Sequence, residues 1–244
     1  MRTHASAQLI GDRSHQCDAT ATATGPNGAR AYALLDGIGS TDEVRDWTRQ
    51  AARRLARTAA YHADAETGLR AQYGRYAADP DRQGPWARQP DACAVVAVTS
   101  PRWLTVAWCG DTRAYLLVGG RLIRLTQDHN LRRVLPPNED HGGGNRNIVT
   151  SYLGSVETDQ EVKGRYGHAA IETTTRQLEN SRLLLASDGA YEPLEDAGLD
   201  LSGYLVGDVA ETARAFVDTA VATARAVADP YADNATVLIA DLRA

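Results

Sequence analysis

Lysine, methionine and phenylalanine are nearly absent from this sequence of 244 residues. Lys163 is the only lysine, and methionine and phenylalanine occur once each. The other basic residues are therefore arginines, and acidic residues outnumber them to give a formal net charge of −5. Because binding to nucleic acid needs a concentrated basic face, this charge balance argues against a nucleic-acid partner.

Cysteine is scarce too, and no long apolar run is present. Cys17, Cys93 and Cys109 are odd in number and widely spaced, which is typical of reduced thiols in a cytosolic protein. The sequence has no Cys-x-x-Cys or His-Glu-x-x-His motif, which argues against a structural zinc or zinc-protease site. No apolar run approaches the ~20 residues that span a bilayer, and the N-terminus lacks the apolar core of a signal peptide. We therefore expect a cytoplasmic protein with no membrane segment.

Aspartates stand at the ends of several apolar runs of strand length. Residues 31–35 lead into Asp36-Gly37-Ile38-Gly39, and residues 183–186 lead into Ser187-Asp188-Gly189. Residues 105–109 lead into Gly110-Asp111, and Asp233-Asn234 precedes the run 235–240. A single Asp-Gly after a strand is usually a turn. Four such carboxylates in one chain instead favour a site where strand ends meet around a cation.

Turn signals and periodicity predict an α+β fold in one domain, residues 1–244. Strands are expected within 7–36 around a turn at 25–28, at 94–99, 104–109, 114–118, 121–125 and 183–186, within 161–175, and from 235. One helix is expected to begin at a capping box formed by Ser40 and Glu43, and two more are expected over 66–76 and 148–153. The last helix is expected to run from Asp208 to a stop at 229–230, with Val227 on its buried face. Strands and long helices are segregated, which favours antiparallel sheets covered by helices. Residues 130–147, rich in glycine and proline, are expected to form a mobile surface excursion.

The carboxylates suit a hard divalent cation. Mg²⁺ and Mn²⁺ prefer oxygen ligands, which Asp36, Asp188 and Asp233 could supply from different strands, together with the Gly37 carbonyl. Two ions sharing a carboxylate can activate a water and clamp an in-line displacement at phosphorus. Arg13, in the polar loop nearest in sequence to Asp36, could hold phosphate oxygens in a fork.

The order of these motifs resembles the metal-dependent protein phosphatases of the 2C type, the PPM family. The family pattern of an arginine followed by Glu-Asp is matched by Arg13 and Asp18. The later motifs then follow in family order over about residues 8–242: Asp36 to Gly39, Gly110-Asp111-Thr112-Arg113, Leu125 to His129, Leu153-Gly154, Ser187 to Gly189, and Asp233-Asn234.

The resemblance implies a four-layer αββα sandwich of two antiparallel sheets flanked by antiparallel helix pairs. It implies two Mn²⁺ or Mg²⁺ ions, bridged by Asp36, with the Gly37 carbonyl on one and Asp188 and Asp233 on the other. Asp111 would bind a third, looser ion. Arg13 would hold the substrate phosphate, and residues 130–147 would be a short flap beside the cleft. Around the metal ligands, a second set of residues would hold them in place: Asp18, Cys17 and Asn234.

Two departures from the family pattern bear on activity. Cys17 stands where the family usually has a glutamate that serves the second metal. The affinity of that site for its metal should therefore be weakened, or its preference should shift towards Mn²⁺ if the thiolate is a ligand. Ile38 stands where many members have a histidine proposed as proton donor. Asp36, Asp188 and Asp233 are retained, which favours an active enzyme.

The resulting hypothesis is a bacterial signalling enzyme, a protein-serine/threonine phosphatase in which a hydroxide bridging the two ions attacks phosphorus in line. Its expected partners are a phosphorylated protein and an opposing Ser/Thr kinase, and we expect a monomer. Two alternatives stay open. One is a pseudophosphatase or phosphoprotein-binding module with a weakened metal site, which Cys17 motivates. The other is a phosphatase of small metabolites, which the short flap and Ile38 motivate.

Overall fold

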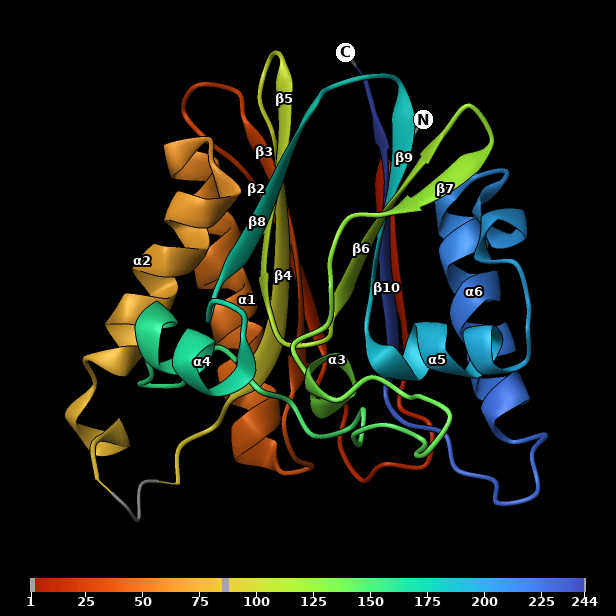
Figure 1. Ribbon diagram of the computed structural model, residues 1–244. Coiled ribbons are helices and arrows are strands. Elements are labelled where there is room, and N and C mark those ends of the chain that lie inside the picture. Colours follow the sequence, from red (N-terminus) through yellow and green to blue (C-terminus); the bar gives the residue numbers. More distant parts are fainter. Residues whose placement is uncertain (1–2, 85–87, 244) are drawn as a thin grey trace.

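The computed structural model describes residues 3–84 and 88–243, which form two five-stranded antiparallel sheets packed face to face (Figure 1). The first sheet has the order β1 (His4–Leu9), β10 (Ala235–Leu242), β9 (Ser181–Ala186), β6 (Arg113–Val118), β7 (Arg121–Arg124). The second has the order β2 (Ala19–Thr24), β3 (Arg30–Gly37), β4 (Ala92–Thr99), β5 (Trp103–Cys109), β8 (Glu172–Gln177).

Helices cover the outer face of each sheet. Helices α1 (Asp42–His62) and α2 (Ala65–Ala77) lie on the second sheet, and α5 (Asp188–Asp196) and α6 (Val209–Ala224) lie on the first (Figure 1). The short helices are α3 (Leu131–Val134), α4 (Asp159–Tyr166) and the 3₁₀ turns Pro80–Arg82 and Leu201–Leu205. None of the helices in the described part of the chain is long and apolar enough to cross a membrane.

Three hydrophobic layers hold the four structural layers together. One lies between α1, α2 and the second sheet, one between the sheets, and one between α5, α6 and the first sheet. The buried face of α1 is mostly alanine, with Leu55 as its largest fully buried member, so the helix can lie close to the strands. In the middle layer, alternate residues of the facing strands meet, including Leu34, Val95 and Leu185. The predicted αββα sandwich is confirmed.

Most predicted elements are present, including the tight Gly119-Gly120 turn between β6 and β7. Four local predictions were wrong. Residues 148–153 form isolated bridges to Asn130 and Ala92 instead of a helix. The first part of 161–175 is helix α4 instead of a strand, because Thr158 and Glu161 form a reciprocal capping box, while the last part is strand β8 as predicted. The cap of α1 is Thr41 rather than Ser40.

The fourth error concerns the end of the last helix. Helix α6 ends at Ala224, five residues before the predicted stop at Asp229. Val227 therefore lies beyond the helix with 58% of its surface exposed, instead of on the buried face.

Candidate active site

Strand ends from both sheets meet at one end of the sandwich. In the second sheet, Asp36 on β3 lies opposite Cys93 on β4, and Ala94 lies opposite Cys109 at the end of β5. In the first sheet, Ala186 at the end of β9 pairs with both Val237 and Arg113. The chain passes from β5 in the second sheet to β6 in the first at residues 110–112, so Asp111 lies where the two sheets meet.

Five carboxylates gather at this end. Burial raises the pKa of Asp36 well above its usual range, and the charges of Asp18, Asp188, Asp111 and Asp233 raise it further. The pKa values of Asp18 and Asp111 are raised to about 7, mainly by burial and also by the charge of Asp188. The structure therefore brings together all the aspartates predicted from the strand ends. The charged forms of Asp18, Asp36, Asp111 and Asp188 are disfavoured by burial and by neighbouring charge, which a bound cation would relieve.

The polar loop that carries Arg13 and Asp18 is fixed to the other motifs by hydrogen bonds. The Asn234 side chain accepts from the Cys17 backbone N–H at 2.8 Å and donates to the Ile10 carbonyl at 2.9 Å. The Ser187 hydroxyl donates to Asp18 at 3.0 Å. Asn234 and Ser187 thus position the loop, which gives a physical reason for the polar residues beside Asp233 and Asp188.

Two glycines allow the backbone to pack closely at the centre. A Cβ on Gly37 would come within 2.7 Å of both the Cys17 carbonyl oxygen and the Thr48 hydroxyl oxygen. Gly110 has a φ of +103°, and a Cβ there would lie 2.4 Å from the Cβ of Cys93. A side chain at Gly37 would therefore displace the loop or α1, so this glycine serves packing as well as access to its carbonyl.

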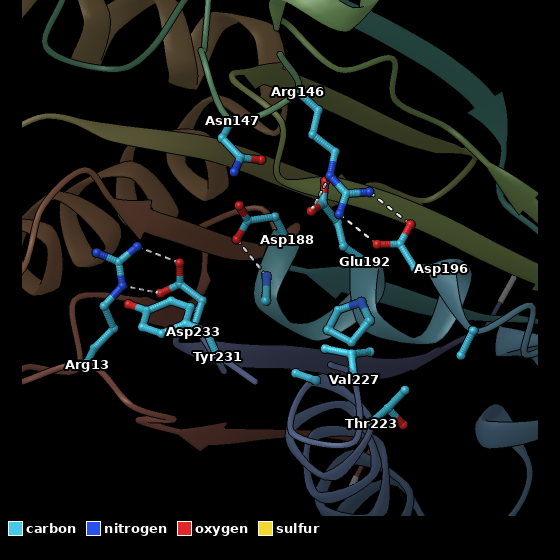
Figure 2. A pocket seen from close by; sticks show the side chains of 14 residues that line it. Arg13, Arg146, Asn147, Asp188, Glu192, Asp196, Thr223, Val227, Tyr231 and Asp233 are labelled. Atoms are coloured by element: carbon cyan, nitrogen blue, oxygen red, sulfur yellow. Dashed lines mark hydrogen bonds and ion pairs between the residues drawn. The ribbon is translucent and has the colours of Figure 1, made fainter. Parts of the chain in front are cut away.

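Arg13 is paired with a predicted metal ligand. Its Nε and Nη2 donate to the two carboxylate oxygens of Asp233 at 2.6 and 2.5 Å (Figure 2). The guanidinium also lies 5.7 Å from the centre of the Tyr231 ring. Both groups of the Arg13–Asp233 pair are about one-third exposed, so the pair faces the cavity rather than the core.

The two departures from the family pattern differ in position. Cys17 is buried, and its thiol donates to the Thr41 carbonyl at 3.7 Å. Burial raises the pKa of this thiol, so the protonated form is favoured at neutral pH, which argues against a thiolate ligand. Ile38 is 42% exposed and follows Gly37 directly.

The Leu125 to His129 motif holds the turn that carries Asp111. The His129 N–H donates to the Gly110 carbonyl at 3.0 Å, and the Gly110 N–H donates to His129 Nδ1 at 3.4 Å. On the other side, the Tyr191 hydroxyl donates to the Asp111 carbonyl at 3.0 Å. The Arg113 guanidinium lies 3.6 Å from the centre of the Tyr191 ring and pairs with Asp128. These contacts join Asp111 to both α5 and the motif at 125–129.

Sequence reasoning missed Glu192 and Arg146. Glu192 lies one turn after Asp188 on α5, and burial raises its pKa to about 8, with the Asp188 charge adding to the effect. Arg146 pairs with Glu192 at 3.0 Å and with Asp196 at 2.6 Å (Figure 2). The i, i+4 spacing from Asp188 could have indicated Glu192 if the helix from Asp188 had been predicted. Nothing in the sequence pattern indicates that Arg146 reaches α5.

The donor set fits a hard divalent cation. It consists of carboxylates and backbone carbonyls, and the buried Asp18 Oδ1 has no hydrogen-bond partner among the described residues. Within 3–84 and 88–243, however, no group of three or more His, Cys, Asp or Glu side chains is arranged to hold an ion as it stands. Both oxygens of Asp233 accept from Arg13, and its Oδ1 also accepts from the Asn234 N–H at 2.7 Å. An ion at Asp233 would therefore use the remaining lone pairs of this carboxylate or displace Arg13.

A cavity of about 410 Å³ opens beside the carboxylates. Figure 2 shows Asp188 between Arg13 and Arg146, with Asp233 beside Arg13. Arg146 and Asn147 belong to the predicted flap at 130–147. The cavity therefore combines carboxylates that suit a cation with an arginine that suits a phosphate.

Known proteins share this sequence pattern and fold. The protein phosphatase 2C family model matches residues 5–134, more than half of the chain. The chain is 29% identical over 194 residues to a probable protein phosphatase 1N of Homo sapiens, covering 71% of this chain and 45% of that protein. It is 28% identical over 139 residues to the serine/threonine protein phosphatase PstP of Mycobacterium tuberculosis, covering 54% of this chain and 24% of that protein. The chain thus spans about half or less of the length of these curated relatives.

Solved structures agree over nearly the whole chain. The Mycobacterium tuberculosis serine/threonine phosphatase PstP/Ppp superposes with a TM-score of 0.68 at 24% identity, covering 99% of this chain and 98% of that one. PppA of Pseudomonas aeruginosa gives 0.71 at 22% identity, covering 98% and 96%. A structure of the PstP catalytic domain with two manganese ions gives 0.65 at 22% identity, covering 99% and 98%. With the family match over residues 5–134, the motifs in order and the sandwich that gathers their aspartates, the chain belongs to the protein phosphatase 2C family.

Proposed function

We propose that this chain is a metal-dependent phosphatase that hydrolyses phosphoserine and phosphothreonine in proteins. The observation that carries the proposal is the gathering of Asp36, Asp111, Asp188 and Asp233 at one end of the sandwich. Two of them, Asp188 and Asp233, line a cavity together with Arg13. Membership of the protein phosphatase 2C family supports the same activity. The manganese ions described for the PstP catalytic domain support the choice of Mn²⁺ or Mg²⁺.

Each proposed residue has a distinct part in the reaction. Asp36 and the Gly37 carbonyl, with Asp188 and Asp233, would hold two ions, and Asp111 would hold a third. The bound ions would supply an activated water and offset negative charge on the phosphoryl group. Arg13 would leave Asp233 for the substrate phosphate, which can accept the same forked pair of hydrogen bonds. Asp18, Cys17 and Asn234 would keep the ligand loop in place.

The proposal includes the biological setting predicted from the sequence. The substrate would be a phosphorylated protein, opposed by a Ser/Thr kinase, in the bacterial cytoplasm. The three cysteines are free, which supports a reducing compartment. We also propose that residues 1–244 form one domain, that it acts as a monomer, and that residues 130–147 serve as its flap.

A second candidate function is phosphoprotein binding without turnover. Cys17 favours it, since a protonated thiol directed to Thr41 cannot replace the carboxylate that the family places there. Ile38 favours a variant of the first proposal, a small-metabolite phosphatase, because an isoleucine cannot protonate a poor leaving group.

Hydrolysis of an aryl phosphate with Mn²⁺ tests the proposal. We expect turnover that a chelator abolishes and that Asp188→Asn lowers by about 10²-fold or more, since this change removes a charged ligand. Asp218→Asn, a carboxylate change on the exposed side of α6, is the matched control and should retain activity. Absence of turnover at every Mn²⁺ concentration would refute the enzyme and favour the binding module. A panel of phosphopeptides and phosphorylated metabolites then separates the two enzyme hypotheses.

A further inference from the structure

One face of α5 forms a continuous wall of the cavity. Its lining residues follow helical spacing: Asp188, Gly189, Glu192, Pro193, Asp196 and Ala197. The wall starts at the carboxylate cluster and ends at Ala197, about 13 Å along the helix axis at 1.5 Å per residue. An extended peptide advances about 3.3 Å per residue. A peptide bound along this wall would therefore reach Ala197 about four of its own residues away from the carboxylates.

The far end of the cavity is largely apolar. It is lined by Pro193 of α5, Ala197 directly after α5, Ala224 at the end of α6 and Val227 beyond that helix, with the polar Thr223 beside them. Val227 is 58% exposed, and Figure 2 shows it with Thr223 on the side of the cavity opposite Arg146. Exposed apolar side chains lining a hollow that continues from a reaction centre are typical of a ligand subsite.

The charged groups that line the cavity determine whether an acidic, a basic or an apolar side chain of a bound peptide fits there. Both arginines that line it are paired, Arg13 with Asp233 and Arg146 with Glu192 and Asp196. An acidic side chain beyond the phosphate would therefore meet no free guanidinium and would face surplus carboxylates. A basic side chain would be attracted by the surplus carboxylates, but it would compete with Arg146 for both oxygens of Asp196, and the ions of the proposed centre would offset Asp188 and Asp233. An apolar side chain remains as the occupant that fits.

We propose that the pocket formed by Pro193, Ala197, Ala224 and Val227 binds an apolar side chain two to four residues from the phosphorylated residue of a peptide substrate. This inference rests on the proposed phosphatase function and adds a sequence preference to it. Val227 is the specificity-determining residue, because it is the large apolar side chain of this group that is exposed, at 58%. The short segment between α6 and β10 thus contributes to substrate choice through Val227.

Phosphopeptides that differ at one position test the inference. Each peptide has leucine, glycine or aspartate two, three or four residues before or after phosphoserine. The kcat/KM of each enzyme variant for a peptide is divided by the kcat/KM of the same variant for an aryl phosphate. We expect leucine at one of these positions to be preferred over glycine by about tenfold, as burial of one aliphatic side chain allows, and aspartate to be the poorest. Val227→Asp should remove the leucine preference, and Val227→Leu should retain it. Val206→Asp, an apolar position 78% exposed and outside the cavity, is the matched control and should keep the preference.

The same experiment distinguishes a wrong assignment of the apolar pocket from a wrong assignment of phosphatase activity. If wild-type protein hydrolyses the aryl phosphate but shows no leucine preference, or Val227→Asp keeps it, the apolar pocket is refuted and the phosphatase stands. If no hydrolysis occurs, the phosphatase is refuted, and the same peptides are tested for binding by fluorescence anisotropy. Equal affinity for the leucine and glycine peptides would then also refute the pocket, and tighter binding of the leucine peptide would support it.

Discussion

Both oxygens of Asp233 accept from Arg13, so a metal ion at Asp233 would compete with the arginine or use the remaining lone pairs of the carboxylate. The paired geometry, with both oxygens accepting from one guanidinium, is the one that a phosphate also offers to arginine. Tyr231 lies against the guanidinium and helps to keep it at the cavity. In the proposed reaction, Arg13 would exchange the Asp233 carboxylate for the substrate phosphate without leaving the site.

Replacing Arg13 tests its proposed role in phosphate binding. Arg13→Ala is expected to raise KM for an aryl phosphate by about tenfold or more, because hydrogen bonds to a charged group contribute about 1.5–3 kcal/mol. Arg13→Lys should recover only part of this loss, since an ammonium group lacks the fork. Steady-state kinetics measure both variants, with Arg49→Ala on the exposed side of α1 as the control. An unchanged KM in Arg13→Ala would contradict the assignment.

At the scale of single elements, the contacts of His129 join β8 to the turn before Asp111. Its Nε2 lies 3.1 Å from Glu172, and its Nδ1 accepts from Gly110. These two contacts require the neutral ring with the proton on Nε2, because a proton on Nδ1 would face the Gly110 N–H. Burial accordingly lowers the pKa of His129 to about 4, although the Glu172 hydrogen bond opposes this.

His129 should make stability depend on pH. Its pKa is 6.5 in an ordinary environment and about 4 in the fold, so the unfolded chain binds the extra proton first. The free energy of unfolding should therefore fall as pH falls from about 6.5 to about 4, by about 3 kcal/mol from this group. Chemical denaturation across this range, compared with His129→Gln, measures the contribution. His141→Gln on the exposed flap is the control, and an equal slope in His129→Gln would contradict the prediction.

Glu172 contributes to the pH dependence of the free energy of unfolding at lower pH than His129 does. Burial would raise its pKa, but hydrogen bonds from His129 and Arg133 outweigh this and lower it to about 2. Its stabilisation is complete above pH 4.5 and is lost between about 4.5 and 2. The two windows overlap between about pH 4 and 4.5, so of these two groups only His129 contributes to a loss of stability above pH 4.5.

At the scale of the whole molecule, the carboxylate cluster is a stability cost that a cation offsets. Asp36 lies on the second sheet, Asp188 follows β9 of the first sheet, and Asp111 lies in the connection between the sheets, so their mutual repulsion acts across the junction of the sandwich. Ligands that bind the folded chain stabilise it by about 2.7 kcal/mol at 100 times Kd. For a chain of this size, each kcal/mol raises Tm by about 2–4 °C.

Mn²⁺ should therefore raise the melting temperature. At 100 times its Kd we expect an increase of roughly 5–10 °C, measured by calorimetry and reversed by chelator. Asp188→Asn should reduce the increase, while Asp218→Asn on the exposed side of α6 should keep it. This measurement does not depend on turnover, so it tests the metal site even in a protein that only binds phosphoproteins. A Tm that is independent of Mn²⁺ would refute the metal site.

Much of the architecture and the acidic part of the site followed from local sequence. Turn residues, strand-length apolar runs and the aspartates at their ends depend on neighbours in the chain, so they predict antiparallel sheets covered by helices and the aspartates placed together. The four-layer sandwich was predicted from the family resemblance. The errors also have local causes. Residues 161–166 have little apolar periodicity, and the capping box at Thr158 and Glu161, which marks their helix, was missed. Helix α5 was not predicted from the residues after Asp188.

The partners of these residues were decided by tertiary structure alone. Arg13 pairs with Asp233, which is 220 residues away in sequence, and Arg146 pairs with Asp196, 50 residues away. The end of α6 at Ala224 exposes Val227, although its helical spacing indicated burial. A sequence pattern reports which side chains are available, because chemistry and local spacing are written in it. Which carboxylate is paired, and which apolar side chain faces a cavity, depends on where separate strands and helices meet.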